Sequence, residues 1–188
     1  DTLDLSEVES VPDDATAIIL VGPQTPVRQD EVNKIAAYME RGGRMVILAD
    51  PPYVDEYESL VSTNTFLLED SPFSQYLWDE FGIRAREDLI SDTTAAYVNE
   101  FNVLASVINQ SNPIMAGFPA ADILFPFARS IEIADPLNVD NPDLTERQAQ
   151  YVREPMLLTS NESFGETRLR DVNVDNLADF DPDEDTAG

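Results

Sequence analysis

The sequence predicts an α/β fold built around a parallel β-sheet. Two continuous aliphatic runs, at residues 17–21 and 45–49, have the composition of strands that are covered on both faces. The segment between them has the periodicity of an amphipathic helix. A strand, a helix and a second strand within about 35 residues form a βαβ unit, whose right-handed crossover makes the two strands parallel.

The helix of this unit is expected over residues 28–41. Four apolar residues recur at positions i, i+3, i+4 and i+7, which places them on one helix face: Val32, Ile35, Ala36 and Met39. Gly42 and Gly43 follow the helix and can take the left-handed conformation that ends it. The second aliphatic run begins directly after this pair and closes at Asp50-Pro51-Pro52.

A second helix is expected over residues 73–81. Ser71 and Pro72 have the chemistry of an N-cap and of a first helical residue, and Gly82 suits the C-terminal stop. The later part of the chain predicts only short strand-like pieces, at residues 89–90, 101–108, 122–127, 128–134 and 155–160. Residues 1–170 are expected to form a single α/β domain, and residues 171–188 an acidic, poorly packed tail.

The composition excludes several classes of function. The 188 residues include 37 Asp and Glu but only 11 Lys and Arg, which gives a formal net charge of −26. Such a field repels nucleic acid and anionic lipid headgroups, so neither is expected as a direct partner. Two interpretations of the acidity remain open: solubility in salty or variable surroundings, and attraction of a basic partner or of divalent cations.

The chain contains neither cysteine nor histidine. Nucleophilic Cys/His or Ser/His/Asp catalysis is therefore excluded, as are zinc and haem sites with Cys or His ligands. The acidic run at 179–185 lacks the glycine and the distal glutamate of a calcium loop, so we expect no metal and no cofactor. The chain has neither a basic signal-peptide start nor an apolar run of about 18 residues. We expect it to be part of a longer protein whose membrane anchors lie outside it.

An ordered set of short motifs runs through nearly the whole chain. The set is Gly22-Pro23, Tyr38-Met39-Glu40-Arg41-Gly42-Gly43-Arg44, Asp50-Pro51-Pro52, the helix end and short strand at 77–92, Asn112-Pro113-Ile114, the stretch 125–131 and the stretch 157–166. In this order the motifs resemble the extracytoplasmic domain of ABC-type transport system auxiliary proteins, the group that includes the gliding-motility G component. One departure is Asn112, which stands where histidine is frequent in the family.

The resemblance implies a three-layer sandwich with a mostly parallel sheet, flavodoxin-like or similar to class I glutamine amidotransferases. It implies a parent protein that is membrane-anchored and that carries this domain on the extracytoplasmic face of the cell membrane. The partners it implies are the permease and ATPase subunits of an ABC transporter. The family brings no catalytic residue set, so we expect a domain that is not an enzyme and acts through protein or ligand binding.

Polar residues at predicted strand ends are the candidates for a binding site. Gly22 and Asp50 each follow an aliphatic strand, and Thr159, Ser160 and Asn161 follow the late one. Ligands of open α/β sheets bind beyond the carboxyl ends of the strands, so these residues are predicted to line one crevice.

Three alternatives remain open. In the first, the Asp50-Pro51-Pro52 segment turns the chain and has no part in binding. The chain can also be a carboxylate-dependent hydrolase or sugar-processing enzyme with its site near Asp50. The third alternative, a solute-binding protein, is disfavoured because a single βαβ unit does not predict two matched lobes.

Overall fold

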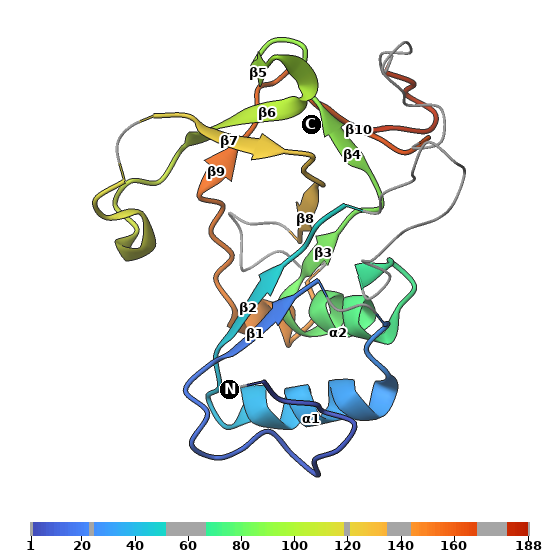
Figure 1. Cartoon of the computed structure of the whole chain (residues 1–188), viewed down its shortest axis with the longest axis vertical. Coiled ribbons are helices and arrows are strands. Elements are labelled where there is room, and N and C mark those ends of the chain that lie inside the picture. Colours follow the sequence, from blue (N-terminus) through green and yellow to red (C-terminus); the bar gives the residue numbers. More distant parts are fainter. Residues whose placement is uncertain are drawn as a thin grey trace.

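A computed structural model describes residues 2–22, 25–51, 67–118, 121–134, 144–168 and 180–187. Within these ranges two α-helices lie towards one end of the molecule, and most of the strands lie towards the other (Figure 1). No described helix is long and apolar enough to cross a membrane.

The predicted βαβ unit is confirmed. It consists of β1 (Ile18–Val21), α1 (Gln29–Glu40) and β2 (Met45–Leu48), and the two strands pair in parallel. The N-terminus of α1 is capped by Glu31 in its first turn, whose carboxylate accepts the backbone N–H of Arg28 at 2.8 Å. Gly42 follows the helix with a φ of +85°, the left-handed conformation that glycine adopts without strain.

The two faces of this pair of strands have different surroundings. Ile18, Leu20, Met45 and Ile47 point towards the helices and pack against the main hydrophobic core. The alternate residues, Ile19, Val21, Val46 and Leu48, are exposed on the opposite face. The prediction that both strands are covered on both faces is therefore wrong, because α1 covers only one side.

The second helix, α2 (Pro72–Phe81), begins and ends as the sequence predicts. The hydroxyl of Ser71 accepts the N–H of Ser74 at 3.3 Å, and Gly82 ends the helix with a φ of +65°. Phe73 is fully buried on the inner side of α2, together with Ile35 of α1 and Leu67. The core therefore lies between the two helices and the inner face of the β1–β2 pair.

The remaining elements are short. The strands are β3 (Ile83–Ala85), β4 (Leu89–Ser91), β5 (Ala96–Tyr97), β6 (Asn99–Val107), β7 (Ile123–Pro126), β8 (Ile131–Ile133), β9 (Leu157–Leu158), β10 (Phe164–Glu166) and β11 (Thr186–Ala187). Two 3₁₀ turns are η2 (Pro113–Met115) and η3 (Gln148–Gln150). Most of these strands lie within or beside the short pieces that the sequence predicts.

Their pairing overturns the predicted fold class. Beyond β1 and β2, the described strands pair antiparallel: β11–β10–β4 form one sheet, β3–β8 another, and β5–β6–β7 a third in which β9 also pairs with β6. The flavodoxin-like or amidotransferase-like three-layer sandwich with a mostly parallel sheet is therefore wrong. The fold is rich in small antiparallel sheets, because in the described chain no α-helix follows α2 to carry a strand back into parallel register.

Part of the predicted acidic tail is included in the description. Residues 171–179 and Gly188 lie outside the described ranges, whereas residues 180–187 lie within them. Strand β11 pairs with β10, and the ring of Phe180 lies 5.4 Å from that of Phe164. The division of the chain at residue 170 stays a prediction.

Candidate functional site

Gly22 and Asp50, two of the predicted binding residues, follow the carboxyl ends of neighbouring parallel strands. Gly22 comes after β1 and has a φ of +46°, and Asp50 comes shortly after β2. Asp50 is exposed, and its backbone carbonyl accepts a hydrogen bond from the Arg129 guanidinium at 3.4 Å. These two residues therefore share one sheet edge, as predicted from parallel strands.

Thr159, Ser160 and Asn161 lie in a different setting. They follow β9, which pairs with β6 and not with β1 or β2. The N–H of Ser160 donates to the carboxylate of Asp92 at 3.1 Å, and the hydroxyl of Thr159 lies 2.6 Å from that of Ser163. The structure thus places the five predicted residues at two sheets, and their role in binding stays a prediction.

Sequence reasoning missed a set of charged residues that the structure buries beside β4. We call Asp88, Asp92, Arg129 and Glu166 the buried polar cluster. Asp88 and Asp92 flank β4, Glu166 ends β10 opposite Leu89 of β4, and Arg129 lies between β7 and β8. Charged side chains are seldom buried without compensating partners, so the contacts of each member explain its place.

Arg129 joins three backbone segments through four carbonyl oxygens. Its guanidinium donates to the carbonyl oxygens of Arg86 at 2.5 Å, Ala85 at 3.1 Å, Leu67 at 3.3 Å and Asp50 at 3.4 Å. Burial lowers the pKa of Arg129, while the negative charges of Asp88, Glu87 and Glu69 act in the opposite direction. The forked guanidinium suits this role because it carries five donors in fixed geometry.

Asp88 fixes the position of the next segment. One carboxylate oxygen accepts the N–H of Ser130 at 2.8 Å, and the other is buried without a hydrogen-bond partner in the described chain. That second oxygen faces Gly165, where an added Cβ would lie only 2.1 Å from it. Gly165 is therefore required by the close approach of the Asp88 side chain.

The pKa values of Asp92 and Glu166 are shifted in opposite directions. Burial acts to raise the pKa of Asp92, but hydrogen bonds from Ala95, Ser160 and Thr94 together outweigh it, so the pKa is lowered. Burial raises the pKa of Glu166, although the N–H of Arg168 donates to its carboxylate at 2.7 Å. Asp92 is thus held as an anion, whereas Glu166 retains its proton to a higher pH than an exposed glutamate does.

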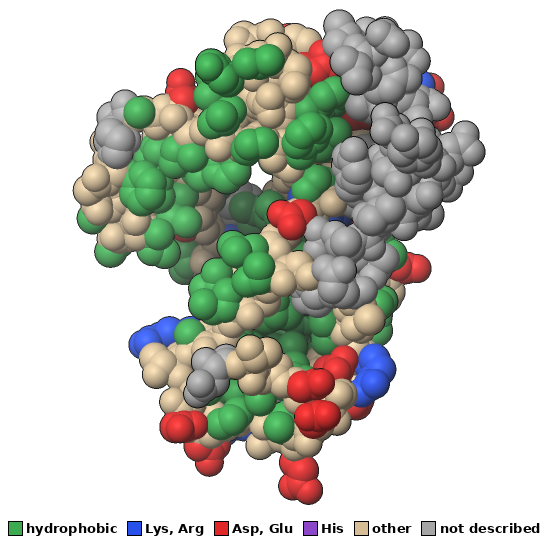
Figure 2. Space-filling model, viewed as in Figure 1, with side chains coloured by type: hydrophobic (Ala, Val, Ile, Leu, Met, Phe, Trp, Pro, Cys, Tyr) green, Lys and Arg blue, Asp and Glu red, His purple; other side chains and the backbone are tan. Residues whose placement is uncertain are grey.

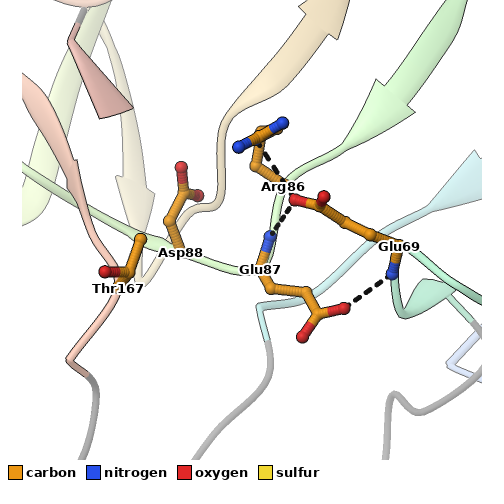
Figure 3. A pocket seen from close by; sticks show the side chains of 5 residues that line it. All are labelled: Glu69, Arg86, Glu87, Asp88 and Thr167. Carbon is orange, nitrogen blue, oxygen red and sulfur yellow. Dashed lines mark hydrogen bonds and ion pairs between the residues drawn. The ribbon is translucent and has the colours of Figure 1, made fainter. Parts of the chain in front are cut away.

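An acidic cavity of about 370 Å³ opens next to the buried polar cluster. It is lined by Glu69, Arg86, Glu87, Asp88 and Thr167 (Figure 3). Residues 86–88 link β3 to β4, and Figure 3 shows the side chains of Arg86 and Asp88 on one side of this stretch and that of Glu87 on the other. Glu69 pairs with the guanidinium of Arg86 at 3.2 Å.

The carboxylates of the cavity are only partly engaged. Glu87 accepts the backbone N–H of Glu69 at 2.6 Å, and Glu69 accepts that of Glu87 at 3.4 Å. Each uses a single carboxylate oxygen to do so. The remaining oxygens can accept hydrogen bonds from a donor or a cation. Among the described residues, however, no group of three or more acidic side chains is arranged to hold a metal ion.

One protein family matches the sequence over its whole length. The family described as "ABC-type uncharacterized transport system" matches residues 1–188, which is the whole sequence. The chain belongs to this transport family. No curated protein matches it.

A solved structure described as "mmIFT52 N-terminal domain" is similar to this member of the transport family. The two share 16% sequence identity with a TM-score of 0.48, over 72% of the present chain and 57% of the other. The chain thus spans little more than half the length of that protein. At this level of similarity, nothing about fold or function is transferred.

The residues that carry the resemblance to the transport family contribute much of the buried polar cluster. Asp88 and Asp92 bound the segment 88–92, Arg129 lies in 125–131, and Glu166 ends 157–166. Three segments that are distant in sequence therefore meet beside β4 (Figure 1). The signal that could have identified these residues was their place in the motifs, since each is a charged residue within or at the end of one of these three stretches.

Proposed function

We propose that the chain is a non-catalytic extracytoplasmic domain of an auxiliary component of an ABC-type transport system, and that it acts by binding. The observation that carries the proposal is the family match, which extends over residues 1–188. Family membership indicates an auxiliary part in transport. The extracytoplasmic location and the contact with permease and ATPase subunits are the finer parts of the proposal.

The contacts of Asp88, Asp92 and Arg129 favour a structural part for these buried charges over a catalytic one. Asp88 and Asp92 accept backbone N–H groups, and Arg129 donates to backbone carbonyls, so these side chains hold segments of the fold together. The alternative of a hydrolase near Asp50 gains no support, because Asp50 is exposed and does not line the acidic cavity. A carboxylate that acts as a general acid or base needs a tuned environment of the kind that burial provides.

Co-purification from the native membrane tests the transport role. The full-length parent protein would be tagged and extracted, with a parent lacking residues 1–188 as control. We expect the ABC permease and ATPase to be recovered with the complete parent and to be depleted with the shortened one. Recovery of neither subunit, in a detergent that keeps other transporters intact, would contradict the proposal.

The absence of cysteine from the chain allows a direct test of location. Val152 is 83% exposed, so Val152→Cys introduces a single accessible thiol without disturbing the core. Intact cells would be treated with a membrane-impermeant maleimide, with the unmodified parent as control for thiols elsewhere. Labelling in intact cells is expected. Labelling that requires lysis would place the domain on the cytoplasmic side.

A further inference from the structure

The exposed side of the β1–β2 pair forms a compact aliphatic surface, which we call the outer face. It consists of Ile19, Val21, Val46 and Leu48, which are 65%, 64%, 47% and 50% exposed. The parallel register sets Ile19 beside Val46 and Val21 beside Leu48, so the four side chains form two adjacent rows. Figure 2 shows hydrophobic side chains gathered in this part of the molecule.

An exposed face is unusual for a parallel pair of strands. Crossover helices normally cover both faces of a parallel sheet, which is why its strands are continuously aliphatic. Here the sequence of both strands is of that kind, IILV and MVIL, but α1 and α2 lie on the inner side alone. The residue types on the outer face are thus those of a sheet that has a second helical layer.

We propose that the outer face binds an amphipathic helix of a partner subunit, with an aliphatic stripe bordered by Lys and Arg. The aliphatic stripe would supply the missing second layer, since a helix is the element that packs on a parallel sheet. The inference rests on the proposed function, in that the partner is a subunit of the transport system. It adds the surface that is used and the chemistry of the segment that occupies it.

The basic borders follow from charge complementarity. The chain has a net charge of −26. The exposed residues Asp13 and Asp14 precede β1 in the chain and the exposed Asp50 follows β2, although Asp13 also pairs with Arg41 at 3.5 Å. The positive charge of Arg44, which is also exposed and precedes β2, offsets part of this negative charge. A second copy of this chain would bring two strongly negative surfaces together, so self-association through the outer face is disfavoured.

The test compares two double variants of the full-length parent. Ile19→Ser with Val46→Ser removes aliphatic surface from the outer face, and Ile114→Ser with Val152→Ser removes it from sites that are 70% and 83% exposed elsewhere. We expect the outer-face variant to recover at least about tenfold less permease and ATPase than the wild type, because two aliphatic side chains would no longer contribute buried apolar area to the interface. The control variant should recover them as the wild type does.

Each other outcome has a definite meaning. Unchanged recovery with the outer-face variant overturns this inference and leaves the proposed function intact. Failure of the wild type to recover either subunit removes the proposed function, and this inference with it. Serine has a lower β-strand propensity than isoleucine or valine, so the outer-face variant of the chain should melt a few degrees below the control whatever covers the face. A fall of much more than about 8 °C would show that the chain itself covers the face, which also overturns the inference.

The chemistry of the occupant is tested by crosslinking. A photoreactive phenylalanine analogue at position 46 of the parent should form crosslinks to a helical segment of a partner subunit that carries Lys or Arg beside an aliphatic stripe. Raising NaCl to about 1 M should reduce recovery, since it shortens the range of charge attraction to about 3 Å. Crosslinks to a second copy, or to an acidic segment, would refute the proposed occupant.

Discussion

Replacing Arg129 by methionine removes the side chain that joins three backbone segments. Methionine has a similar length and fills the space, so the change isolates the hydrogen bonds from the packing. Two of the carbonyls that would lose their donor, those of Leu67 and Ala85, belong to residues that are only 1% and 5% exposed. Water cannot readily replace the guanidinium at these two positions.

The expected cost follows from this count. A buried carbonyl left without its donor costs about 1–3 kcal/mol, and bonds from a charged donor lie towards the upper part of that range. Two such carbonyls give a loss of about 4–6 kcal/mol in the free energy of unfolding for Arg129→Met. Arg129→Lys should lose less, because an ammonium keeps three donors but cannot span the fork of the guanidinium.

Urea unfolding, followed by circular dichroism and by the fluorescence of the single tryptophan, Trp78, measures this loss. Arg28→Met is the matched control, since Arg28 is 60% exposed and pairs with Asp30 on the surface. The control should leave the unfolding midpoint unchanged. A midpoint for Arg129→Met equal to that of the wild type, at an equal m-value, would refute the idea that these carbonyls depend on Arg129.

Three further predictions concern packing, pH and salt. Gly165→Ala should lower stability by about 1–3 kcal/mol through overpacking against Asp88, and a melting curve equal to that of the wild type would contradict the close approach seen here. Burial raises the pKa of Glu166, so the stability it contributes is present below the usual pKa of 4.5 and is lost as pH rises through the folded-state pKa. The stability of Glu166→Gln should therefore rise relative to that of the wild type as pH increases above 4.5. Because the pKa of Asp92 is lowered, Asp92→Asn should have a smaller free energy of unfolding than the wild type above pH 3.8, and this difference should vanish as pH falls through the folded-state pKa. Urea titrations at several pH values measure both trends, and the reverse trend would show that the signs are wrong. Because the net charge is −26, raising NaCl from 0.1 to 1 M should raise the melting temperature, and a fall would argue against self-repulsion as the dominant electrostatic effect.

The β1–α1–β2 unit and α2 could be predicted from the sequence because their information is local. The aliphatic runs, the periodicity of α1, and the caps at Ser71, Gly42 and Gly82 all act within a few residues of where they stand. The later sheets could not be predicted in this way. Their strands are mostly two to four residues long, and β4 pairs with β10 from a distant part of the chain, so no periodic pattern specifies their direction.

The candidate site was harder to predict for a related reason. Asp88, Asp92 and Glu166 are three among 37 acidic residues, and only the fold shows that they are buried. Gly22 and Asp50 could be placed at one edge since both follow parallel strands, whereas the strand before Thr159 gave no hint of its pairing with β6. The aliphatic runs also concealed the outer face, because a strand covered on both sides and one left open on one side have the same sequence.

The difference between local and distant pairing has a consequence for the order of folding. The β1–α1–β2 unit is complete by residue 48, so it can form while the rest of the chain is still being synthesised. The ladder of β4 with β10 and β11 needs residues 164–187, and closing so long a loop has an entropic cost that slows its formation. Pulse-labelling hydrogen exchange during refolding should therefore protect the amides of β1 and β2 before those of β4. Asp88 packs against Gly165 of β10, so we expect its carboxylate to leave water only when β10 pairs with β4.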